Sequence, residues 1–362
     1  MVVGAKANSK DGRIEGLPGV DPESGYKQKV VQWSFGAVSP PLVVEVSDPI
    51  PAPSGNGKVC YVVYTAESDV APHFLNGRKG VYVRTDEFSA RFEARLANDS
   101  ELRHLLDRRK LILERRTALL ARARRRFNTY AEARRQLPGG TSATSLPLLE
   151  ICVLPRFPSK PVCEIENLAA LITGNRLGWR QTGFPVSASS VISQQESSIV
   201  LGASGPTSMF EMNTWGTLYY GTPVANNDNI QVIYGIHLFG FVGYLLLFIR
   251  HAATVLRVLG YTGPIYIEVV LGSIRSIPWL RSSSPEGSAM RGSELDNDVT
   301  FSIDTTSEAI FLEPDKIATD ILRYVLYSVN LPGLVDSLEK LKQLIRGGYE
   351  YNFWRIPPRL QT

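Results

Sequence analysis

The chain has 362 residues, 44% of them hydrophobic and 20% charged, which is an ordinary globular composition and enough length for two domains. Its three cysteines, Cys60, Cys152 and Cys163, are odd in number and irregularly spaced, which does not fit a disulfide framework and favours reduced thiols in the cytosol. The net charge of +4 is unevenly distributed: residues 101–136 hold twelve Lys/Arg and four Asp/Glu, and the rest of the chain holds 27 and 31. The whole positive excess therefore lies on one segment.

The first hundred residues predict a region rich in strands. Residues 2–5 and 13–17 are typical of two strands joined by a tight turn, because Asp11-Gly12 supplies the backbone angles that such a turn needs. Runs of β-branched and aromatic residues predict further strands at 42–46, 59–64 and 80–84, and a short helix is expected at 26–35.

A long helix is predicted from about Asp99 to Arg135. Asn98, Asp99 or Ser100 can cap its start, and Pro138 follows its end. Apolar side chains recur seven residues apart along it, which gives a narrow apolar seam rather than a broad core face. The seam consists of Leu105, Ile112 and Leu119, and in parallel of Leu106, Leu113, Leu120 and Phe127.

The second half of the chain predicts a mixture of strands and helices. Strands are expected at 148–154, 197–201, 209–220, 265–270, 300–303 and 309–312, helices at 164–173, 315–329 and 334–345, and a loop at 281–297. The apolar run 236–249 is short for a bilayer span and predicts a buried core helix instead. No signal peptide is evident at the N-terminus, so we expect a cytoplasmic protein without a membrane partner.

Three stretches of the first hundred residues occur in a particular order. They are Val2–Ala5 with Asp11–Leu17, Val62–Tyr64 through Ala71–Leu75, and Gly80–Arg84. In this order they resemble the later part of a Schlafen AlbA_2 domain, with its hairpin ending in Gly-Leu, its Pro-His turn and its Tyr-x-Arg strand. The resemblance covers about a quarter of the chain. It implies a nucleic-acid-binding protein, with RNA or DNA as partner and a role in regulation or defence.

The same resemblance implies an enzymatic alternative. Schlafen-type ribonucleases hold a metal through carboxylates on an opening Glu-Phe-Lys segment and just after the Val-Gly strand. Here the opening segment is not in the sequence, and the second place reads Gly4-Ala5-Lys6, without a carboxylate. Since metal-assisted hydrolysis needs closely placed acidic ligands, a ribonuclease is expected only if the carboxylates lie upstream.

The basic helix carries the candidate contacts to a polyanion. Arginine and lysine side chains bind phosphates, and this function requires them to face solvent. Two other readings remain open: a solvated spacer between two domains, and a homodimer formed through the apolar seam of residues 105–127. The candidate cations are Arg108, Arg109, Lys110, Arg115, Arg116, Arg122, Arg124, Arg125 and Arg126.

The predicted strand at 80–84 supplies two further candidates. Alternation places Tyr82 and Arg84 on one face, where they could stack on bases and pair with phosphates, although a half-exposed strand shows the same alternation. A phosphate-binding loop is not expected. In the nearest approach, the run Gly55 to Val59, Ala52 stands where the first glycine belongs and Val59 where a hydroxyl belongs. No cofactor or metal site is predicted.

The sequence thus predicts a mixed α/β (α+β) fold. The expected parts are a partial AlbA_2-like domain at 1–97, the basic helix at 98–136, a linker at 137–147, and an α+β domain with an apolar core helix at 148–362.

Overall fold

A computed structural model shows a mixed α/β fold that divides into two compact units, Met1–Glu114 and Arg115–Thr362. The division falls inside one continuous helix, within the range expected to be a separate spacer. The structure describes residues 2–7, 14–40, 42, 44–65, 68, 71–77, 80–84, 94–135, 147–177, 184–185, 191–195, 197–202, 208–224, 235–280, 289–292 and 296–351. The linker expected at 137–147 lies outside the described residues except for Pro147.

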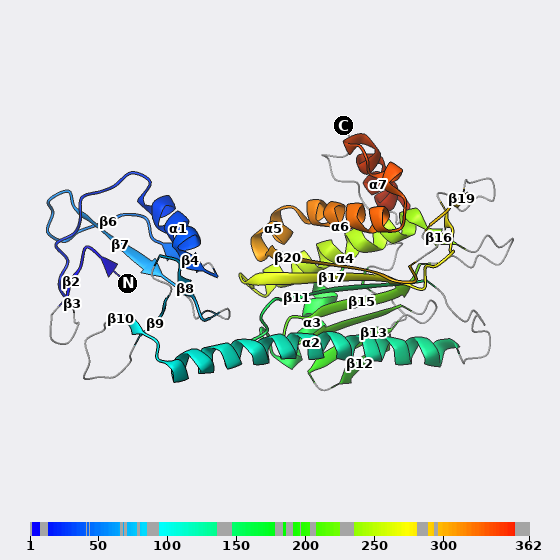
Figure 1. Ribbon diagram of the computed structural model, residues 1–362, viewed down its shortest axis with the longest axis horizontal. Coiled ribbons are helices and arrows are strands. Elements are labelled where there is room, and N and C mark those ends of the chain that lie inside the picture. Colours follow the sequence, from blue (N-terminus) through cyan, green and yellow to red (C-terminus); the bar gives the residue numbers. More distant parts are fainter. Residues whose placement is uncertain are drawn as a thin grey trace. The chain divides into compact units, whose positions relative to one another are not determined.

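The first unit contains small antiparallel sheets and one short helix (Figure 1). One sheet holds β1 (Val2–Val3), β5 (Glu45–Val46), β6 (Ile50–Pro51) and β7 (Val59–Tyr64). A second holds β4 (Val38–Ser39), β8 (Phe74–Leu75), β9 (Gly80–Arg84) and β10 (Ala94–Leu96). The hairpin expected between residues 2–5 and 13–17 forms with a different first strand: β2 (Lys6–Ala7) pairs with β3 (Ile14–Gly16), whereas β1 pairs with β7. The predicted helix is α1 (Tyr26–Ala37).

The core of the first unit is small, and only one face of β7 is covered at the end of the strand that holds Val62 and Tyr64. Tyr61 and Val63 are buried with Val46, and the Tyr61 ring stacks on Tyr26 of α1 at a centroid distance of 4.3 Å. The alternate residues Val62 and Tyr64 point the other way and are 40% and 58% exposed. This unit therefore leaves large apolar side chains in contact with solvent.

The second unit is built on one antiparallel sheet of seven strands in the order β12-β13-β14-β15-β11-β17-β20. A meander forms one half of the sheet, and β11 then pairs with both β15 and β17. The strands are β11 (Leu148–Pro155), β12 (Val191–Gln195), β13 (Ser198–Gly202), β14 (Met209–Asn213), β15 (Leu218–Pro223), β17 (Pro264–Gly272) and β20 (Val299–Thr306). Short strands β16 (Ile236–His237), β18 (Trp279–Leu280) and β19 (Ala289–Met290) form a separate sheet.

Helices cover both faces of this sheet (Figure 1). Strand alternation divides β11, because Leu149 and Ile151 belong to the large core on one face, whereas Cys152 and Leu154 belong to a smaller core on the other. The large core packs against α3 (Ile165–Gly174), α4 (Leu238–Val258), α6 (Pro314–Ser328) and α7 (Leu338–Tyr351). The smaller core packs against the second half of α2 (Asp99–Arg135), the predicted basic helix.

The predicted apolar core helix is α4. Among the described residues it is the one helix long and apolar enough to cross a membrane, but 78% of its most apolar window is buried inside the fold. It lies under α6 and α7, and a polar clamp holds the three together. Arg250 of α4 donates two hydrogen bonds of 2.9 Å to Asp315 of α6, and the Tyr349 hydroxyl of α7 donates a third. The buried carboxylate is thereby fully paired.

Three expectations in the second half of the chain differ from the structure. Residues 309–312 are not a strand but part of α5 (Ser307–Leu312), because the Thr306 side chain caps the helix by accepting a hydrogen bond from the Ala309 amide. The loop expected at 281–297 contains β19, which pairs with β18. The helix expected from residue 334 begins instead as a 3₁₀ turn, Pro332–Leu334, and α7 starts only at Leu338.

The position of α2 on the sheet depends on two glycines. The ring of Phe127 lies over Gly221 of β15, where an added Cβ would come within 2.7 Å of the ring, and Tyr130 lies over Gly202 of β13 at the same distance. A side chain at either position would push the helix away from the sheet.

We expect Gly221→Ala to lower the free energy of unfolding by about 1–3 kcal/mol, because the new methyl group overlaps the buried Phe127 ring. Gly174→Ala is the matched control, since nothing lies within 4 Å of that Cβ position at the end of α3. Urea unfolding measures both variants. Equal stability of the two would contradict the close packing of α2.

Candidate functional site

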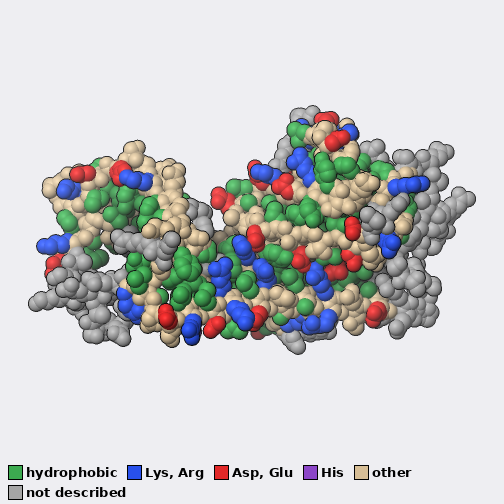
Figure 2. Space-filling view, viewed as in Figure 1, with side chains coloured by type: hydrophobic (Ala, Val, Ile, Leu, Met, Phe, Trp, Pro, Cys, Tyr) green, Lys and Arg blue, Asp and Glu red, His purple; other side chains and the backbone are tan. Residues whose placement is uncertain are grey.

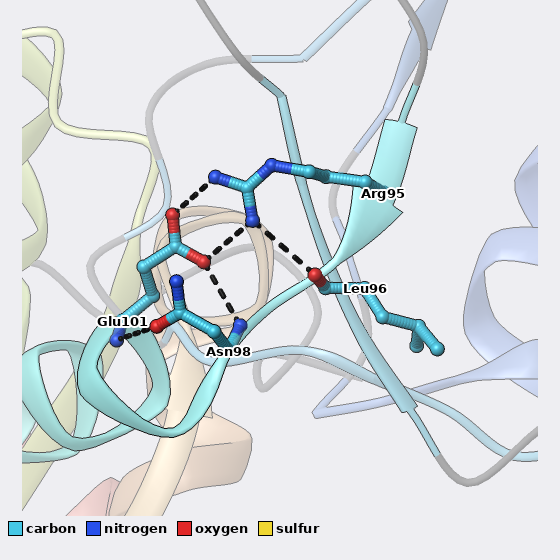
Figure 3. Close-up of polar contacts among 4 residues, drawn as sticks. All are labelled: Arg95, Leu96, Asn98 and Glu101. Atoms are coloured by element: carbon cyan, nitrogen blue, oxygen red, sulfur yellow. Dashed lines mark hydrogen bonds and ion pairs between the residues drawn. The ribbon is translucent and has the colours of Figure 1, made fainter.

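The start of α2 is fixed by a reciprocal cap at Asn98, one of the three residues that the sequence offers as a cap. The Asn98 side chain accepts a hydrogen bond from the Glu101 amide, and the Glu101 carboxylate accepts one from the Asn98 amide, each at 2.9 Å. Arg95 of β10 adds a bidentate ion pair to the same carboxylate (Figure 3). The Arg95 and Asn98 hydrogen bonds hold the pKa of Glu101 at about 2.

The second half of α2 presents an apolar stripe to the sheet, with arginines along both borders. Leu120, Ala123 and Phe127 are buried against β11, β14 and β15. At 100° per residue, Arg122 and Arg124 leave the helix on opposite sides of Ala123. The polar side chains that meet them are therefore on different strands.

The sheet offers a row of side chains beneath the helix. The strand register places Glu211 of β14 beside Tyr219 of β15, Tyr219 beside Cys152 of β11, and Cys152 beside Glu268 of β17. Glu150 lies two residues from Cys152 and so on the same face. Three carboxylates thus lie on the face that α2 covers.

Arginines of α2 neutralise these carboxylates. Arg124 donates hydrogen bonds to Glu150 at 3.2 Å and to Glu268 at 2.6 Å, and it bridges β11 and β17. On the other border, Arg126 donates to Glu211 at 2.7 Å. Glu211 is 1% exposed, and its second carboxylate oxygen has no hydrogen-bond partner among the described residues. Its charge therefore depends on Arg126.

Further arginines of α2 contact uncharged groups of the second unit. The Arg115 guanidinium lies 4.4 Å from the centre of the Trp215 ring and donates to the Pro158 and Ser159 carbonyls. Arg116 lies over the Tyr266 ring at 4.3 Å, and Arg122 donates to the Ser198 hydroxyl. Figure 2 shows blue and red side chains close together along the strip between α2 and the sheet.

Three groups of this network, Arg124, Cys152 and Tyr219, have shifted pKa values. Burial lowers the pKa of Arg124, but Glu268 and Glu150 more than offset this and raise it overall. Burial, and then the Glu268 charge, raise the pKa of the Cys152 thiol well above its usual range. Burial and Glu150 raise that of Tyr219, whose hydroxyl donates to Glu150 at 2.8 Å. Cys152 is thus a protonated packing residue and not a nucleophile.

The expectation that the arginines of α2 face solvent is therefore wrong for Arg115, Arg116, Arg122, Arg124 and Arg126, which turn toward the sheet. Arg108 and Arg109 are half-buried and have partners of their own. The described part of α2 leaves three basic side chains exposed, Arg103, Lys110 and Arg125, against four acidic ones, Asp99, Asp107, Glu114 and Glu132. The local charge of +8 is not displayed on the exposed surface of the helix.

The apolar seam of α2 is also occupied within the chain. Ile112, Leu119, Leu120 and Phe127 are all buried, whereas Leu106 is 45% exposed. Pairing of two α2 helices along the whole of residues 105–127 would require the second half of the helix to leave the sheet. The homodimer expected through this seam is not compatible with the packing of that half.

The other sequence candidates lie in the first unit. Tyr82 of β9 is 37% exposed, and its cross-strand partner on β10 is Leu96, which is 58% exposed. The backbone of Arg84 is in β9, but its side chain lies outside the described residues. Val83 points to the opposite face, where it lines an open hollow of about 510 Å³ with Ser100, Glu101, His104 and Leu105 of α2. Leu96 is not among the residues that the sequence singles out. Its position opposite Tyr82 comes from the pairing of β9 with β10.

The glycine-containing loop at residues 52–59 is a hairpin. The Ala52 amide donates to the Lys58 carbonyl at 2.9 Å, and the loop joins β6 to β7. A phosphate-binding loop leads from a strand into a helix N-terminus. This connection between two paired strands has a different geometry.

Comparisons with known proteins give no relative for this chain: no family model, no curated protein and no solved structure matches it.

The network predicts a stability effect for arginine substitutions in α2. We expect Arg126→Gln to lower the free energy of unfolding by about 3 kcal/mol, because it leaves the buried Glu211 carboxylate without its ion pair. Arg125→Gln, on the exposed side of the same turn, is the matched control and should change stability by less than about 0.5 kcal/mol. Thermal unfolding measures both, and equal effects would refute the network.

The cap predicts a pH dependence. Because the pKa of Glu101 is lowered from 4.5 to about 2, its contribution to stability is fully present above about pH 4.5 and is lost as the pH falls through about 2. An NMR titration of the Glu101 carboxyl measures this pKa. Arg95→Gln should raise it toward 4.5, whereas Arg103→Gln, an exposed arginine of the same helix, should not. A wild-type value near 4.5 would show that the ion pair does not form.

Proposed function

We propose that this chain is a protein-interaction protein whose first unit binds another protein through the face of β9 and β10 that carries Tyr82 and Leu96. This develops the interaction-protein alternative that the sequence leaves open, and moves the contact from the α2 seam to a sheet face. The observation that carries it is the exposed leucine directly opposite the exposed tyrosine.

The chemistry of this pair supports a protein partner. Tyrosine is enriched in the energetic centres of protein interfaces, and an exposed aliphatic neighbour gains free energy when a partner covers it. A surface that binds nucleic-acid bases gains binding free energy from aromatic stacking and from nearby cations. An exposed leucine contributes little to either interaction. The small core of the first unit, which leaves Val62 and Tyr64 in solvent, points in the same direction.

A nucleic-acid partner remains a prediction, and fewer exposed cations of α2 now support it. On the described part of α2 it would now depend on the exposed cations Arg103, Lys110 and Arg125, which share their surface with four acidic side chains. The resemblance to the AlbA_2 domain, and the ribonuclease alternative that follows from it, also remain predictions. Binding to RNA or DNA that weakens steeply with salt would support this reading.

Capture of the partner by the immobilised chain tests the proposal. We expect a protein that stays bound after nuclease treatment and in about 0.5 M salt, since apolar contacts are not screened. Leu96→Asp should weaken capture about tenfold or more. Leu111→Asp is the matched control, because Leu111 is a similarly exposed leucine, at 61%, on α2. Captured nucleic acid that is insensitive to Leu96→Asp would replace this proposal with the nucleic-acid reading.

A further inference from the structure

The last strand of the seven-stranded sheet, β20, has an open edge. It pairs with β17 in unbroken register from Val299 opposite Leu271 to Thr306 opposite Pro264, and no described strand pairs with its other side. The backbone groups on that side are a template for a further strand. Eight residues are enough for a stable pairing.

The strand itself lacks three of the features that commonly prevent such pairing. Edge strands are commonly protected by proline, lysine, a bulge or an unpaired charge. None of the first three occurs in the sequence Val-Thr-Phe-Ser-Ile-Asp-Thr-Thr, whose pairing with β17 shows no shift of register. Its one charged residue, Asp304, forms an ion pair with Arg156 at 3.1 Å.

The two faces along this edge differ in character. Thr300, Ser302 and Asp304 are exposed on one face, and Phe301 and Ile303 pack against the large core on the other. Next to Phe301 lies the ring of Tyr324 of α6, at a centroid distance of 4.5 Å. Tyr324 remains 46% exposed, and its ring adds an exposed aromatic surface beside the apolar face of β20.

We propose that β20 pairs with β20 of a second copy of this chain, in antiparallel orientation, so that two sheets join into one. A two-fold axis perpendicular to the sheet keeps each face on its own side, and the strand is therefore its own complement. Apolar residues meet apolar residues beside the two Tyr324 rings, and polar residues meet polar residues on the other face.

The register of this pairing is centred on Ser302. Directly opposite residues in an antiparallel pair share a face, so the centre must be a residue and not a bond between residues. Centring on Ser302 sets Phe301 opposite Ile303 and Asp304 opposite Thr300. Centring on Ile303 would require Thr306, which already caps α5 with its side chain and begins the turn away from the sheet. Centring on Asp304 would oppose two carboxylates.

Light scattering after size exclusion, at chain concentrations up to about 100 μM, tests the pairing. We expect a dimer for the wild-type chain and a weakening of about tenfold or more for Ser302→Lys, which places two ammonium groups across the two-fold axis. An equal mixture of Ser302→Lys and Ser302→Glu should recover a heterodimer. Thr173→Lys adds the same charge at an exposed position of α3 and should leave the dimer unchanged.

A wild-type chain that stays monomeric at this concentration overturns the proposal. So does a dimer that Ser302→Lys leaves intact, since that dimer would form through another surface. Ser302 is exposed but stands opposite Glu268 and hydrogen-bonds Tyr266, so thermal unfolding of Ser302→Lys is measured beside the wild-type chain to show that the variant is folded. The outcome is independent of partner capture through Leu96, because the two surfaces belong to different units.

Discussion

The docking of the second half of α2 on the seven-stranded sheet is the contact from which the other conclusions follow. Its centre is apolar, with Leu120 and Phe127 over the sheet, and glycines at 202 and 221 allow the close approach. Its borders are ionic, with Arg124 and Arg126 on Glu150, Glu268 and Glu211. Apolar burial supplies most of the free energy, and the ion pairs set the orientation, since misplacing the helix would leave buried charges unpaired.

This contact changes the role that can be inferred for the basic residues of α2. Twelve basic residues in a short stretch are the usual electrostatic signature of a polyanion-binding surface. Here most of the described cations match charges and aromatic rings of the same chain, and the exposed side chains in the described part of the helix are slightly more acidic than basic. The basic side chains of α2 therefore mainly attach this helix to the sheet of the same chain.

The surfaces that we propose for recognition are sheet surfaces. In the first unit, one helix covers one side of β7, and apolar side chains on other strand faces stay exposed. In the second unit, helices protect both faces of the sheet while the edge at β20 stays open. In β20, strand alternation separates apolar from polar side chains, so this edge can select a partner by pattern as well as by shape.

The sequence by itself determined the mixed α/β class and most of the elements, because periodicity and capping residues are local properties: α2, α4, β11 and β17 form where the pattern predicts them. The local pattern predicted a strand at residues 309–312, but the hydrogen bond that caps the helix at Thr306 favours α5 there. Only the tertiary structure decided the direction of the arginines. Glu150, Glu211 and Glu268 lie far from α2 in sequence, and strand pairing alone brings them beneath it.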